Sequence, residues 1–77
     1  MKKTHQLTAI IEREDDMYVA SCPELDVVSQ GSSVEQAKSN LQEAVELFLE
    51  SASETEIAGR LHSEIFITRI DVAIGQI

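Results

Sequence analysis

The chain has 77 residues, with six Lys and Arg against fourteen Asp and Glu, which gives a formal net charge of -8. This length supports a single domain, residues 1–77, whose small core contributes little net stability. The excess of acid argues against direct nucleic-acid binding, which requires basic side chains to neutralise phosphates, and suits a basic protein partner. Cys22 is the sole cysteine, which excludes an intrachain disulfide and a zinc site built on several cysteines.

The sequence contains no stretch long enough to form a transmembrane helix. The opening "MKKTHQLTAII" begins with two lysines, but its apolar run is short and is followed at once by "EREDD", which is not the pattern of a signal peptide. We therefore expect a cytoplasmic protein without membrane contacts. Because a small domain without a disulfide or structural metal needs another source of stability, we also expect self-association.

The first predicted element is a strand from His5 to Glu14. Leu7, Ala9 and Ile11 alternate with more polar residues in this stretch. The acidic pair at 15–16 predicts a tight turn into a second strand, which makes a β-hairpin.

The second predicted strand covers "MYVASC", residues 17–22, and ends at Pro23 because proline has no amide hydrogen to donate to a sheet. The residues that follow, "PELD", predict a bend, and "VVSQ" predicts a short third strand. Gly31 then breaks the pattern, either by adopting a positive φ or by allowing a close approach of the chain.

After Gly31 the spacing of apolar residues changes from two to about 3.6, which predicts a helix over 34–51. Two capping boxes fit its start, Ser32 with Glu35 and Ser33 with Gln36, and the sequence leaves both open. The expected apolar face of the helix consists of Val34, Ala37, Leu41, Ala44, Val45, Phe48, Leu49 and Ala52.

The stretch "SASETEIAGRLH" predicts a loop with at most one helical turn. The final stretch "EIFITRIDVAI" returns to a period of two and predicts a fourth strand in the same sheet. One face of that strand would carry Phe66, Thr68, Ile70, Val72 and Ile74, and the other Ile65, Ile67, Arg69, Asp71 and Ala73. The order strand, strand, strand, helix, strand predicts an α+β two-layer fold, a small and mostly antiparallel sheet covered by one helix.

No catalytic, cofactor or metal site is predicted. Cys22 is expected to be a buried, inert thiol, and both histidines, His5 and His62, are expected to be solvent-exposed because they lack the spacing of metal ligands. A metal-dependent nuclease would need converging acids, and three candidates lie on the predicted first and last strands: Glu12, Glu14 and Asp71. We interpret these acids as solvated charges at strand ends.

Two long stretches, "LTAIIERE" and "YVASCPELDVVSQGSSVEQAKSNLQEAVELFLE", together with the tail "FITRIDVAIGQI", resemble the HicB family of antitoxin domains. The ordered pattern is a strand ending in Ala-x-Cys-Pro-Glu-Leu, a short strand, a glycine and a Ser-capped helix with Glu-x-Ala. The resemblance implies a pared-down ribonuclease H-like fold without a complete catalytic acid set. It also implies binding and neutralisation of a small, basic, mRNA-cleaving toxin of the HicA type.

Many HicB proteins add a C-terminal DNA-binding module, and we expect none here because the sequence stops directly after the predicted last strand. Other hypotheses are a HicB-like oligomeric scaffold for a different ligand and the nuclease considered above. Candidate contacts for a basic partner are the acids of the two strand-connecting turns: Asp15, Asp16, Glu24 and Asp26. We further expect a homodimer or a higher even-numbered oligomer, with Ile65 and Ile67 at the interface.

Overall fold

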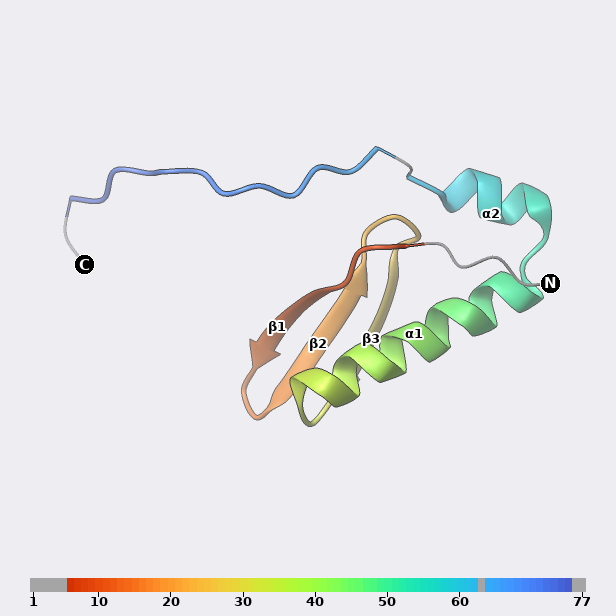
Figure 1. Cartoon of the computed structure of the whole chain (residues 1–77), viewed down its shortest axis with the longest axis horizontal. Coiled ribbons are helices and arrows are strands. Elements are labelled where there is room, and N and C mark those ends of the chain that lie inside the picture. Colours follow the sequence, from red (N-terminus) through yellow and green to blue (C-terminus); the bar gives the residue numbers. More distant parts are fainter. Residues whose placement is uncertain (1–5, 63, 76–77) are drawn as a thin grey trace.

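The computed structural model describes residues 6–62 and 64–75, and within them it shows a three-stranded sheet and two helices (Figure 1). The strands are β1 (Ile10–Glu14), β2 (Met17–Cys22) and β3 (Val27–Gly31), and the helices are α1 (Val34–Ser51) and α2 (Glu54–Arg60). The sheet has the order β1-β2-β3 and is antiparallel throughout, with α1 lying across one face. The predicted α+β class is therefore confirmed.

The register of the sheet places one residue from each strand in a row beneath α1. Ala20 of β2 lies opposite Ile11 of β1 on one side and Ser29 of β3 on the other. β1 begins at Ile10, later than predicted, and the predicted starting residue, His5, lies outside the described residues. A two-residue turn joins β1 to β2, and its first residue, Asp15, has a φ of 56°. Aspartate is one of the few non-glycine residues that adopt this left-handed conformation routinely.

Helix α1 starts at the second of the two possible caps. The Ser33 hydroxyl accepts a hydrogen bond from the Gln36 amide at 3.0 Å, while the Gln36 side-chain oxygen accepts from the Ser32 amide and hydroxyl. These bonds satisfy backbone donors that the first turn of a helix cannot pair internally. The predicted bounds of the helix are confirmed at both ends.

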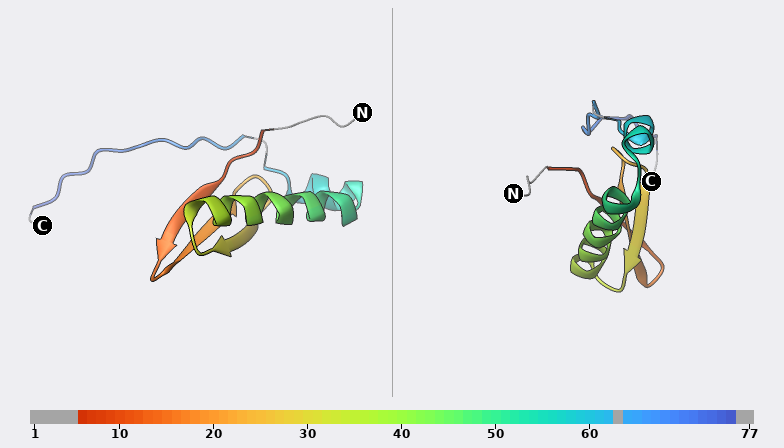
Figure 2. Two further views of the ribbon diagram at one scale, coloured as in Figure 1. Left: turned by 60° about the horizontal axis from the view of Figure 1, so that its bottom comes forward. Right: turned by 90° about the vertical axis from the view of Figure 1, so that its right-hand side faces the viewer.

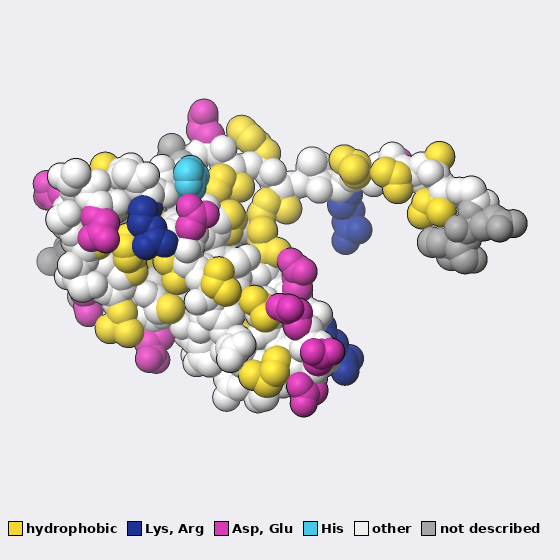
Figure 3. All heavy atoms as spheres, turned by 180° about the vertical axis from the view of Figure 1, so that it is seen from behind, with side chains coloured by type: hydrophobic (Ala, Val, Ile, Leu, Met, Phe, Trp, Pro, Cys, Tyr) yellow, Lys and Arg dark blue, Asp and Glu magenta, His cyan; other side chains and the backbone are white. Residues whose placement is uncertain are grey.

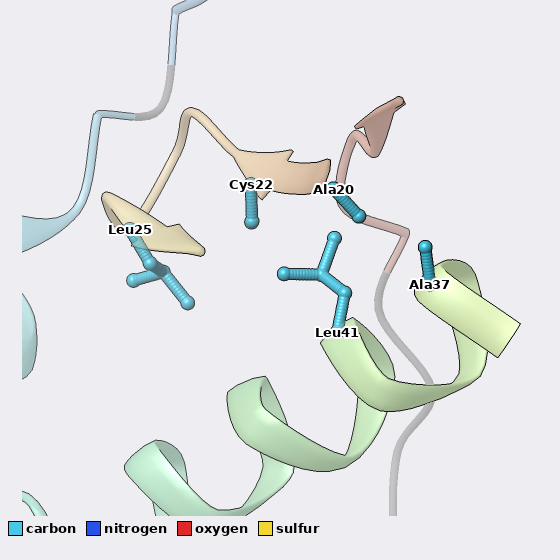
Figure 4. Close-up of a cluster of buried hydrophobic side chains, with 5 residues drawn as sticks. All are labelled: Ala20, Cys22, Leu25, Ala37 and Leu41. Carbon is cyan, nitrogen blue, oxygen red and sulfur yellow. The ribbon is translucent and has the colours of Figure 1, made fainter. Parts of the chain in front are cut away.

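The buried core consists of five side chains between α1 and the sheet (Figure 4). Ala20 and Cys22 come from β2, Leu25 from the β2–β3 turn, and Ala37 and Leu41 from α1. Leu41 points from the helix toward the β2 side chains (Figure 4). The helical face was predicted too broadly, because a sheet of three short strands does not cover the whole of an 18-residue helix. Two residues assigned to that face, Val34 and Leu49, are exposed.

Gly31 permits the closest contact between helix and sheet. A Cβ atom added at Gly31 would lie 2.5 Å from the Ala37 amide nitrogen and 2.8 Å from the Gln36 carbonyl carbon, both backbone atoms. Its φ is not positive, so of the two roles expected for this glycine, the close approach is correct.

The segment predicted to be a loop after α1 forms the helix α2 instead. Ser53 caps it by accepting a hydrogen bond from the Glu56 amide, and Glu54 and Glu56 in its first turn complement the helix dipole. The small, polar composition and Gly59 obscured these signals in the sequence. None of the residues of α2 is fully buried.

The predicted fourth strand does not join the sheet. Residues 64–75 form an extended arm that pairs with no strand in the described part of the chain, and it leads away from the body of the molecule in Figure 1 and in the left view of Figure 2. The alternating pattern predicted a strand, but the arm has an extended backbone without strand pairing. The pattern could not specify a hydrogen-bonding neighbour, because alternation records which side of a strand is apolar and not which strand lies beside it.

Replacing Gly31 with alanine is expected to destabilise the protein by about 1–3 kcal/mol, because the new methyl group would overlap the backbone of α1. The matched control is Gly59→Ala in α2, where an added Cβ meets nothing within 4 Å. That change is expected to be neutral or to stabilise by up to about 1 kcal/mol, since alanine is the better helix former. Urea unfolding of both variants measures the difference, and equal stabilities would contradict the close approach.

Leu41→Ala is expected to lower the free energy of unfolding by about 2–5 kcal/mol, since Leu41 is only 3% exposed and lies at the centre of the core. Leu47→Ala on the same helix is the control, because Leu47 is 57% exposed and leaves no cavity. Thermal unfolding followed by circular dichroism compares the two. A similar melting temperature for both variants would show that the assigned face of α1 is wrong.

Candidate functional site

The β2–β3 turn is organised by the carboxylate of Glu24. Both of its oxygens accept hydrogen bonds from the Thr8 amide, at 3.0 Å each, and one also accepts from the Thr8 hydroxyl at 2.7 Å. Partial burial by itself would raise the pKa of Glu24, but the hydrogen bonds from Thr8 outweigh it and hold that pKa below its usual range. The bonds tie the segment before β1 to a turn that lies 16 residues further along the chain.

Cys22 lies beneath this turn with its thiol directed at the same carboxylate. Its Sγ atom donates to Glu24 Oε1 at 3.5 Å, and the residue is buried. Burial raises the pKa of the Cys22 thiol. The hydrogen bond to Glu24 and the negative charge of that carboxylate raise it further. The predicted burial of this cysteine is confirmed, and its environment favours the neutral thiol over the nucleophilic thiolate.

The residues at the end of α2 attach to the other side of the same turn. The His62 amide donates to the Glu24 carbonyl at 2.7 Å, and the His62 ring lies 3.1 Å from an Asp26 carboxylate oxygen. Arg60 donates to the Asp26 carbonyl at 2.9 Å, and its guanidinium carbon lies 4.6 Å from the centre of the Phe48 ring. The turn therefore joins the start of β1, the end of α2 and the base of the arm.

The opposite end of the sheet carries an acidic tip, which we define as Glu14, Asp15 and Asp16. All three residues are exposed, and the neighbouring Arg13 donates through Nε to the Asp15 carbonyl at 3.0 Å. Acidic side chains gather over this hairpin at the lower right of Figure 3. The acidic tip can attract a basic surface without first breaking internal contacts.

The four acids predicted to contact a partner do not form one patch. Asp15 and Asp16 lie at one end of β2, whereas Glu24 and Asp26 lie at the other end and make contacts within the chain. Sequence reasoning missed Thr8, Arg60 and His62 as partners of these acids. No local signal could have found them, because the pairs are separated by 16 to 36 residues.

The acids considered for a nuclease are also separated. Glu12 and Glu14 alternate onto one face of β1, while Asp71 lies in the arm, outside the sheet. Within residues 6–62 and 64–75, His, Cys, Asp and Glu side chains form no group of three or more that could hold a metal ion. In the same part of the chain no helix has the length and apolar character needed to cross a membrane.

The fold is a small α+β domain in which one helix covers a three-stranded antiparallel sheet. A curated protein is similar to it in sequence. The chain is 37% identical over 70 residues to a UPF0150 protein of Helicobacter pylori (strain J99), an alignment that spans 90% of this chain and 97% of that protein. The chain therefore belongs to the UPF0150 family. No protein-family model matches the sequence, and no solved structure matches it either.

The hydrogen bonds to Glu24 predict a specific loss of stability in acid. Because the pKa of Glu24 is lower in the folded than in the unfolded protein, its stabilising effect is present above the unfolded value of about 4.3 and disappears as the pH falls through the folded value. Glu24→Gln is therefore expected to be less stable than the wild type at pH 7, with a difference that shrinks in acid. Urea unfolding across pH 2–7 tests this, with exposed Glu43→Gln on α1 as the control. A stability difference between Glu24→Gln and the wild type that does not change with pH would contradict it.

Proposed function

We propose that the chain is a non-catalytic, antitoxin-like module that binds and occludes a small, basic, mRNA-cleaving toxin of the HicA type in the cytoplasm. The stretches that resemble HicB form β1, β2, β3 and α1, which are the whole of the sheet and the helix that covers it. The net charge of -8 supports a role in binding a basic partner.

The observation that carries the proposal is the acidic tip. Glu14 is the last residue of β1, Asp15 and Asp16 form the turn that follows, and all three are exposed. Grouped charges of one sign speed the encounter with a partner of the opposite sign and make binding sensitive to salt. Glu24 and Asp26 contribute to the negative field at the other end of the sheet while they hold the fold together.

The test starts by co-purifying the tagged chain from its native cell, and a small basic protein recovered with it is taken as the candidate toxin. Recovery of no such protein would count against the proposal. Titration of the tagged chain into a toxin-catalysed mRNA cleavage assay is expected to stop cleavage at a stoichiometric ratio, and calorimetry should show an affinity that falls as salt rises. Cleavage that continues with excess chain would overturn the proposal, as would cleavage of RNA by the chain alone in Mg²⁺.

Two charge-matched variants locate the contact. One replaces the acidic tip by Glu14→Gln, Asp15→Asn and Asp16→Asn, where asparagine keeps the left-handed turn favourable. The other removes the same number of charges from the exposed side of α1, by Glu43→Gln, Glu46→Gln and Glu50→Gln. The tip variant is expected to bind roughly tenfold more weakly at low salt, and the helix variant to bind nearly as the wild type does. Equal losses would show that only the overall charge matters.

A further inference from the structure

The arm, residues 64–75, exposes an apolar surface that a folded chain does not normally leave in water. Phe66 is 87% exposed, Ile70 79%, Val72 66% and Ile74 58%, and their spacing places all four on one side of an extended chain. Such a contiguous apolar surface marks an interaction site rather than a solvated loop. Figure 3 shows hydrophobic side chains along the projecting arm.

The dimensions of the molecule also show that the arm does not pack against the rest of the chain. The radius of gyration is 15.2 Å and the longest extent 53 Å, whereas a compact domain of this length has a radius of about 11.5 Å. The arm accounts for the excess, because the sheet and α1 form a short body beside it (Figures 1 and 2). The backbone groups of this extended segment have no strand beside them, so they meet water and are free to pair with the edge of a sheet.

The sheet has a free edge that matches the arm. β1 and β3 are the two edge strands, but α1 packs mainly against β3 and β2 and only lightly against β1. The core face beside β1 therefore lies open, and its residue Ile11 is only partly buried. A fourth strand next to β1 would cover this strip with the apolar side of the arm, which carries Phe66 and Ile70.

The opposite side of the arm also fits β1. If the apolar side faces the core, Arg69 alternates onto the outer face of the sheet, where β1 presents Glu12 and Glu14. An opposite-charge pair on adjacent strands stabilises their pairing. Ile65, Ile67 and Asp71 alternate onto the same side of the arm as Arg69, so in this arrangement the two isoleucines predicted at an oligomer interface would lie on the outer face of the sheet.

We propose that the arm of each chain adds to the free edge of β1 in a second copy, so that two chains exchange arms in a closed two-fold dimer. The contacts of Arg60 and His62 fix the base of the arm to the β2–β3 turn, and from that base the arm leads away from its own sheet. A second copy supplies the edge that the arm lacks and receives an arm in return, which leaves neither chain with an open β1 edge. Glu14 belongs to the acidic tip as well as to this pairing, but the inference rests on the arm and the β1 edge and not on the proposed toxin binding.

The test uses Arg69→Lys, which keeps the charge and provides an amine for carbodiimide coupling to Glu12 or Glu14. Copies labelled with ¹⁴N and ¹⁵N are mixed, unfolded and refolded together, and then cross-linked and digested. The proposal predicts a mass twice that of the 8.5 kDa chain by light scattering, and about half of the peptide pairs joining position 69 to β1 carrying mixed isotopes. Pairs of a single isotope only would show that the arm folds onto its own sheet and would overturn the proposal, as would a monomeric mass or a dimer without these cross-links.

Two arm variants separate the proposed interface from a general effect on the arm. Ile70→Asp places a charge on the apolar side and is expected to raise the dimer dissociation constant at least roughly tenfold, because the carboxylate would enter a dry interface without a partner. Asp71→Ser changes the neighbouring residue on the other side and is expected to leave the dimer intact. If both variants lose the dimer, or if both keep it, the assignment of Ile70 to the interface side and Asp71 to the other side of the arm would be wrong. Circular dichroism of each variant confirms that sheet and helix are retained.

Discussion

The contact of α1 with β3 at Gly31 determines the rest of this small fold. Because no side chain separates them at this point, the backbone of Ala37 comes within reach of β3 and the helix lies over β3 and β2. Ala37 and Leu41 then meet Ala20 and Cys22 to form the core. The same placement leaves β1 at the margin of the helix. The β3 side of the sheet is therefore well covered by α1, and the β1 side is left open.

The β2–β3 turn secures the other end of the domain through polar contacts. The Glu24 carboxylate holds Thr8 before β1, while its carbonyl holds His62 at the base of the arm. A carboxylate that accepts several hydrogen bonds in this way restrains segments that few apolar contacts could order. The acidic tip at the far end of the sheet takes no part in these bonds, and its turn residues Asp15 and Asp16 are exposed. The end of the sheet at the β2–β3 turn thus holds distant segments together, and the end at the β1–β2 turn exposes negative charge.

The sequence predicted those features that depend on local chemistry. The period of 3.6 and the paired serines predicted α1 with its correct bounds, and the acidic turn and Pro23 predicted the hairpin and its end. Features that depend on distant partners were not predictable, because neither Thr8 nor His62 carries a local sign that it will contact the β2–β3 turn. Helix α2 was missed because it is short and contains Gly59. The arm was predicted as a fourth strand of the same sheet, and this was wrong because the alternation of apolar residues does not specify a neighbouring strand.

The central claim is that the helix leaves an edge of the sheet that only the arm of a second chain completes. Hydrogen–deuterium exchange of the arm amides, followed over a range of protein concentrations, tests it most directly. The account predicts amides of residues 66–74 that are protected at high concentration and lose protection on dilution, together with amides of β1. Arm amides that exchange at unprotected rates at every concentration would contradict the claim. Protection that persists in a sample whose mass is that of one chain would contradict it as well, because it would place the arm on its own sheet.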